Sequence, residues 1–296
     1  MGKQSPSTKL VKYLARVCRT VDRMFVIGSR NIFSDRERTA GFVVEAVDRV
    51  RFFGSYVKCA ASDNNRAVYC YVKNKEAAIR MDKTAQAISF AITTEQDPLR
   101  NMDASHQYLL LVAILSLHYR AGNCAEKSKA IAYFLWKQKH PNIQRIEIFS
   151  FREIDHDFVV INRDINTKIN FPSAWNQDAI IVDLWASKNS IYHVYPASVF
   201  HPNMTTMLCE NNLRRYYGRF ADNASEQRVA CTYAINLATD ILPETFDLQQ
   251  YFIADIVSDP DRQLRLDRAL VDAHKNHEAC VEELKSLFKI SGLKRK

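Results

Sequence analysis

Apolar residues recur at helical spacing through much of the chain. Within residues 7–27 they return every three or four positions, which predicts an amphipathic helix. The same spacing predicts helices over 36–53, 75–92 and 123–139. Residues 103–118 are apolar on nearly every side, which is typical of a helix at the centre of a core.

Short runs rich in β-branched and aromatic residues predict strands. These runs cover residues 67–73, 144–150, 157–162, 178–183 and 190–195. The connections between the last four are too short for crossover helices, so we expect them to form an antiparallel sheet. Helical patterns resume at 224–241 and 259–290.

The order of these elements predicts an α+β fold with helical flanks. We expect an N-terminal helical region over 1–100, an α+β core that carries the chemistry over 101–200, and a C-terminal helical region over 201–296.

Composition agrees with a globular chain. Of the 296 residues, 47% are apolar and 25% are charged, with only seven glycines and eight prolines. The longest apolar run, Leu109 to Leu117, is far shorter than the roughly 20 residues that span a bilayer. The N-terminus is basic and lacks the apolar stretch of a signal peptide, so we expect a soluble protein.

Seven widely spaced cysteines include no C-x-x-C pair. This spacing argues against a disulfide framework or a zinc site, and it favours buried thiols in a reducing cytosol. Neither a phosphate-binding glycine loop nor a metal-ligand spacing is visible, so we expect no cofactor and no metal.

Positive charge is concentrated near the start of the chain. The net charge is +8, and residues 1–56 carry eleven Lys or Arg against five Asp or Glu. A solvated helix face explains this distribution, but an acidic partner or a weak contact of the basic N-terminus with a membrane surface is left open. No nucleic-acid motif accompanies the charge, so nucleic acid is not expected as a partner.

The segment from Arg120 to Glu126 points to chemistry. Asn123 is a good N-cap, and Glu126 three positions later completes a capping box. Cys124 then falls on the first helical turn, where unpaired N–H groups and the helix dipole favour a thiolate and can bind an oxyanion. The alternative is a buried structural cysteine. Gly28-Ser29-Arg30, by contrast, has the composition of an ordinary turn.

Two more residues suit this thiol. His156 opens the strand predicted at 157–162, where an imidazole is held rigidly and can act as a general base. Asp183 ends an apolar strand, where a carboxylate is costly unless paired and can orient an imidazole. A solvated histidine and a strand-ending acid are the alternatives.

Arg-Ala-Gly-Asn-Cys-x-Glu, then His-x-Phe-Val-Val-Ile, then an apolar strand ending in Asp-x-Trp resemble a known family across residues 118–200. The family comprises papain-like and transglutaminase-like Cys-His-Asp enzymes among bacterial type III and type IV secreted effectors. The resemblance implies a helix that carries the cysteine packed on an antiparallel sheet. It also implies Cys124 as nucleophile, His156 as base and Asp183 as orienting acid. Ala125 and Leu184 depart from the family pattern, which has Gly and Pro there.

This resemblance implies a cysteine-dependent amide hydrolase, either a protease or a glutamine deamidase, that acts on a protein substrate through a thioester. A host protein is the expected substrate, after export of the chain into host cytoplasm. The alternatives are a transglutaminase with the same triad and a non-catalytic protein-binding module. The second oxyanion donor stays open between Asn123 and Gln107. The C-terminal segment 282–296 resembles a type IV export signal, or it is an ordinary amphipathic last helix.

Overall fold

The computed structural model describes part of the chain. The described residues are 8–51 apart from 40, 42, 45 and 49, and then 102–151, 156–169, 172–184, 194–197, 229–240 and 242. The strand predicted at 67–73, the helices predicted at 75–92 and 259–290 and the C-terminal segment 282–296 lie outside the described residues.

The chain divides into two compact units. The first, called the sheet unit, comprises Met1–Arg23, Phe134–Ile241 and His277–Lys296. The second, called the helical unit, comprises Met24–Tyr133 and Leu242–Asn276.

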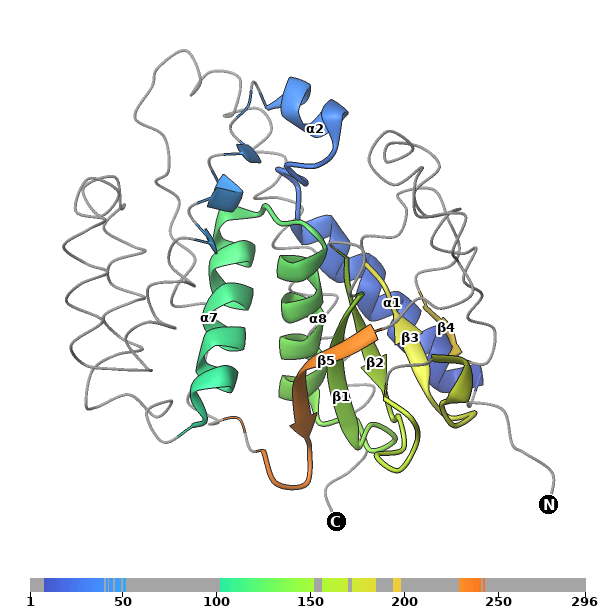
Figure 1. Cartoon of the computed structure of the whole chain (residues 1–296). Helices are drawn as coiled ribbons and strands as arrows, with labels where there is room; N and C mark the ends of the chain where they lie inside the picture. The colour runs from blue at the N-terminus through green and yellow to red at the C-terminus, as the bar shows by residue number, and fades with distance from the viewer. Residues whose placement is uncertain are drawn as a thin grey trace. The chain divides into compact units, whose positions relative to one another are not determined.

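The sheet unit contains a five-stranded antiparallel sheet (Figure 1). Its strand order is β4-β3-β2-β1-β5, so the first four strands form a meander and the last returns beside β1. Together with the helices, this sheet makes the fold α+β, as predicted. The strands are β1 (Arg145–Phe151), β2 (Asp157–Ile161), β3 (Ile180–Val182), β4 (Val194–Pro196) and β5 (Val229–Asn236).

Strand β5 corrects the helix predicted at 224–241. It pairs with β1 from Val229 to Asn236. Its sequence contains β-branched and aromatic residues, which favour a strand. The helical spacing there was misleading because β1, whose other edge is taken by β2, offers a second edge of unpaired backbone groups. A turn closes the strand, in which the Asp240 carboxylate accepts a hydrogen bond of 2.7 Å from the Asn236 N–H.

Three of the predicted helices, over 7–27, 103–118 and 123–139, are confirmed, and the helix predicted over 36–53 is corrected. The helix predicted over 36–53 is interrupted: α2 ends at Arg38, the chain turns through Gly41 with φ of 83°, and the described residues of 43–51 are helical again. No helix among the described residues has the length and hydrophobicity to cross a bilayer. The helices are α1 (Thr8–Met24), α2 (Phe33–Arg38), α7 (Ala104–Tyr119), α8 (Cys124–Gln138) and the short 3₁₀ helix Pro172–Ala174.

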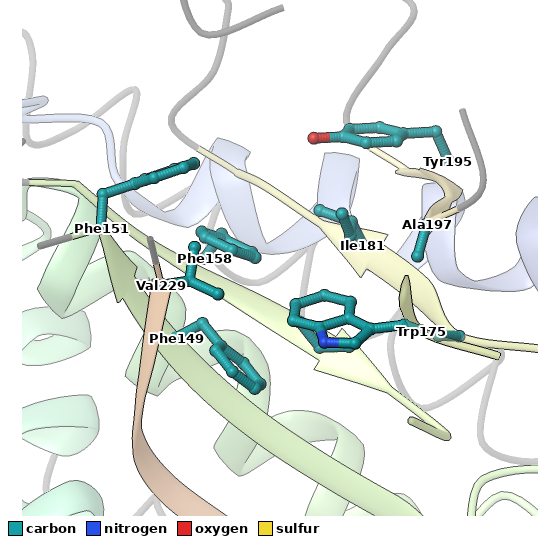
Figure 2. Packing of buried hydrophobic residues seen from close by; sticks show 10 residues of the cluster. Phe149, Phe151, Phe158, Trp175, Ile181, Tyr195, Ala197 and Val229 are labelled. Carbon is teal, nitrogen blue, oxygen red and sulfur yellow. The ribbon is translucent and has the colours of Figure 1, made fainter. Parts of the chain in front are cut away.

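Aromatic side chains cover one face of the sheet (Figure 2). Phe149 of β1 lies 4.8 Å from Trp175 and 6.1 Å from Phe158 of β2, measured between ring centroids. Phe158 also lies 5.2 Å from Phe151. Because side chains alternate between the faces of a strand, residues two apart along β1 and β2 share this cluster.

A buried ion pair lies on this same face of β1. Glu147 is 1% exposed, and both its oxygens accept hydrogen bonds of 2.8 Å from the guanidinium of Arg163. Arg145 adds a third contact of 3.0 Å to the same carboxylate. Arg163 is the second residue after the end of β2, so the pair ties the end of β2 to the centre of β1.

Removing one partner of this pair should destabilise the sheet unit strongly. Arg163→Met leaves Arg145 as the cation that balances the buried Glu147 carboxylate. We therefore expect the free energy of unfolding to fall by about 3–5 kcal/mol. Arg145→Met is the matched control; because its partly exposed side chain makes one contact, it should cost about 1 kcal/mol. Urea unfolding followed by circular dichroism measures both, and equal losses would contradict the assignment.

Candidate functional site

The predicted start of the cysteine helix is confirmed. Cys124 is the first residue of α8 and is 3% exposed. The Asn123 carbonyl accepts the first helical hydrogen bond, of 3.0 Å, from the Lys127 N–H. The Asn123 N–H donates to Glu126 Oε2 at 2.8 Å, which is the return half of a capping box.

The other half of the predicted capping box does not form. Asn123 is 2% exposed, and its side-chain Oδ1 is buried with no hydrogen-bond partner among the described residues. The Asn123 amide is therefore not used as a helix cap, which the sequence pattern could not distinguish. Because Oδ1 accepts no hydrogen bond from the described residues, the amide of Asn123 is not committed to the helix start and lies directly before Cys124.

Glu126 is fixed by a cation from another element. Its Oε1 lies 2.9 Å from Nε of Arg51, while its Oε2 accepts from the backbone of Asn123. The positive charge of Arg51 balances the negative charge of the Glu126 carboxylate. The positive end of the α8 dipole, which favours an anion at the helix start, is therefore not offset by an unpaired acid. Lys127 adds a second cation, with Nζ 5.5 Å from the centre of the Phe25 ring.

A backbone clamp holds the loop before Cys124. The Ile27 N–H donates to the Arg120 carbonyl at 3.0 Å, and the Gly122 N–H donates to the Gly28 carbonyl at 3.0 Å. Ser29 Oγ donates to the Gly122 carbonyl at 2.7 Å. These contacts join segments about 93 residues apart, and they fix the path of the chain into α8.

Residues 28–30 are thus more than the ordinary turn predicted from the sequence. Gly28 has a φ of 98°, and a methyl group added there would overlap the carboxyl group of Asp35. That carboxyl group is buried and accepts a hydrogen bond of 2.9 Å from the Ser29 N–H. No sequence signal relates Gly28 to Gly122, because the contact is between distant segments.

In the sheet unit, the structure brings His156 and Asp183 together. His156 Nε2 lies 2.7 Å from Asp183 Oδ2, and the two residues are 7% and 2% exposed. His156 directly precedes β2, and Asp183 directly follows β3. Because Val159 pairs with Val182, the register places the two residues diagonally across neighbouring strands on one face.

The rings around this pair are apolar, and its titratable neighbours Tyr195 and Cys18 are protonated at neutral pH. The Phe151 and Phe158 rings lie 6.0 and 6.4 Å from the His156 ring. Burial, and then the Asp183 charge, raises the pKa of both the Tyr195 hydroxyl and the Cys18 thiol far above neutrality. Neither neighbour therefore competes as an ionised group for His156.

The contact through Nε2 decides what the imidazole can do. When Nε2–H of the neutral ring donates to the carboxylate, Nδ1 is the nitrogen that can accept a proton from another group. A carboxylate in this position also stabilises the ring after it becomes charged. The pair thus has the geometry that an oriented general base requires.

The predicted site residues are divided between the two compact units of the chain. Cys124 belongs to the helical unit and the His156–Asp183 pair to the sheet unit. Gln107 lies within α7, and Trp185 lies outside the described residues. In the described part of the chain, no group of three or more His, Cys, Asp or Glu side chains could hold a metal ion.

No family model matches the chain, and no curated protein or solved structure is significantly similar to it.

The clamp at Gly28 can be tested with a second glycine of positive φ, Gly41, as the control. Gly28→Ala should lower the free energy of unfolding by about 3 kcal/mol, because a methyl group there displaces the buried Asp35 carboxyl and loses its hydrogen bond. Gly41→Ala is the control: φ is 83° there too, but the space around it is open. It should cost only about 1 kcal/mol. Thermal or urea unfolding distinguishes them, and similar costs would argue against the clamp.

Proposed function

We propose that the chain is a cysteine-dependent amide hydrolase with a papain-like core. In this proposal Cys124 is the nucleophile, His156 the general base and Asp183 the acid that orients it. The observation that carries the proposal is the buried hydrogen bond of 2.7 Å between His156 and Asp183.

The cost of burying these groups favours a chemical role. Removing an imidazole and a carboxylate from water destabilises a fold unless they are paired, and such pairs cluster at functional sites. Cys124 has complementary features: it starts a helix, its neighbour Asn123 has a buried amide oxygen that no described residue hydrogen-bonds, and cations lie nearby at Arg51 and Lys127. A binding module would need none of these.

The proposed reaction proceeds through a thioester. His156 Nδ1 takes the thiol proton, and the Cys124 sulfur attacks the carbonyl carbon of the amide. The oxyanion that develops accepts a hydrogen bond from the Cys124 backbone N–H, and the side-chain Nδ2–H of Asn123 is the proposed second donor. Collapse breaks the C–N bond as His156 returns the proton to the leaving nitrogen. Water, deprotonated by His156, then hydrolyses the thioester and regenerates the thiol.

The bond attacked decides the class of hydrolase. A peptide bond makes the chain a protease, and a glutamine side chain makes it a deamidase that releases ammonia. We propose a protein substrate, in keeping with the resemblance to effectors that act on host proteins. An amine in place of water would give the transglutaminase alternative.

Selective alkylation tests whether Cys124 and His156 act together. At about pH 6–7, which is below the pKa of roughly 8.5 of a free thiol, iodoacetamide should label Cys124 first. Burial raises the pKa of Cys231 to about 12 and that of Cys18 further, so both stay protonated. His156→Ala should slow the Cys124 reaction by about 10²-fold, because the base is lost.

Peptide mapping by mass spectrometry reads each cysteine separately. His140→Ala is the matched control, since His140 is a half-buried histidine of the same unit that makes no contact with Asp183. Asp183→Asn should slow the reaction while keeping the shape of the site. A Cys124 rate unchanged in His156→Ala would overturn the hydrolase and favour the binding module.

The role of Asn123 can be separated from the reactivity of the thiol. Acylation of Cys124 by p-nitrophenyl acetate passes through an oxyanion, whereas alkylation by iodoacetamide does not. Asn123→Ala should therefore lower the acylation rate by about 10²-fold and leave alkylation unchanged. The near-isosteric Asn123→Leu should behave alike. Equal losses in both reactions would show that Asn123 shapes the loop and binds no oxyanion.

A further inference from the structure

The exposed face of α1 is a line of positive charge. Its exposed cations follow one another at intervals of three, four, three and four residues, so they lie along one side of the helix. At 1.5 Å per residue this line is about 21 Å long. We call it the cationic ridge; it consists of Lys9, Lys12, Arg16, Arg19 and Arg23.

The opposite face of α1 is fixed to the protein. It buries apolar side chains, among them Leu10, Leu14, Val17 and Val21. Cys18 on this face lies close enough to Asp183 for that charge to raise the pKa of its thiol. The helix therefore cannot turn its cations inward, and the ridge is a surface of the sheet unit.

The first four cations of the ridge differ from several other arginines of the described residues, which form ion pairs with acids. Arg30, Arg38, Arg51 and Arg163 each contact an Asp or Glu. Within the described part of the chain, no ion pair involves the first four cations of the ridge. Like charges spaced one turn apart repel each other, so this arrangement destabilises an isolated helix. An external anion relieves that repulsion.

We propose that the cationic ridge binds the surface of an anionic phospholipid membrane. The headgroups form a plane of negative charge, and a straight row of cations can approach such a plane along its whole length. Each basic side chain near such a surface strengthens binding about fivefold. The exposed residues of α1 include no aromatic or amide side chain that could stack on nucleic-acid bases or hydrogen-bond to their edges. This composition disfavours nucleic acid as the partner.

This contact is electrostatic rather than inserted. The apolar face of α1 is buried in the protein, so no apolar side chains of the helix are available to enter the lipid. Binding should therefore be reversible and weaken steeply with ionic strength. The proposal does not depend on the hydrolase, because the ridge lies on the far side of α1 from Cys18.

Vesicle co-sedimentation of the full chain tests the ridge. We expect binding to phosphatidylcholine vesicles that contain phosphatidylserine, little binding to phosphatidylcholine alone, and loss of binding in high salt. The variant Lys12→Gln, Arg16→Gln, Arg19→Gln should reduce binding at least about tenfold. All three side chains are exposed, so the variant should fold, and circular dichroism checks that it does.

A control variant removes the same charge elsewhere. Lys137→Gln, Lys139→Gln, Lys168→Gln changes three exposed lysines of the same unit and should leave vesicle binding intact. Duplex DNA at the same ionic strength is the competing probe. Failure to bind the phosphatidylserine vesicles, equal losses in the two triple variants, or tighter binding to DNA would each overturn the proposal.

Discussion

The register of β2 between β1 and β3 controls whether His156 and Asp183 can meet. Side chains alternate along a strand, so a slip of one residue would turn His156 to the opposite face of the sheet. The Glu147–Arg163 pair opposes that slip: Glu147 lies within β1, Arg163 follows β2, and separating them would take the buried Arg163 from its carboxylate and leave Glu147 with Arg145 alone. The ion pair that follows β2 thus stabilises the register on which the His156–Asp183 contact at the start of β2 depends.

The start of α8 depends on a distant part of the chain in a similar way. Arg120 adopts a φ of 53°, which is unfavourable for a residue with a side chain, and the segment around Gly28 holds it there. Because Glu126 and this clamp fix the helix start, the Asn123 side chain is not needed as a cap. Tertiary contacts therefore leave Asn123 Oδ1, beside the thiol, without a hydrogen bond from the described residues, where local capping alone would have used it.

Local signals predicted the elements that rest on local chemistry. The β-branched runs at β2 and β3 and the helix start at Cys124 could be read from neighbouring residues. The strand at β5 could not, because its conformation is set by pairing with β1. The role of Gly28 was also hidden, since its partner Gly122 is far away in the sequence. For His156 and Asp183, strand ends suggested each residue singly, but only the register shows them in contact.

Helix α1 connects the candidate pair with the outer surface of the sheet unit. Its inner face brings Cys18 near Asp183, and its outer face carries the cationic ridge. A helix is about 10–12 Å thick with its side chains. A membrane bound at the ridge would therefore lie roughly one helix diameter from the pair. For the proposed hydrolase, such adsorption would restrict the substrates that meet His156 to those near the lipid surface, so that membrane binding would select substrates as well as location.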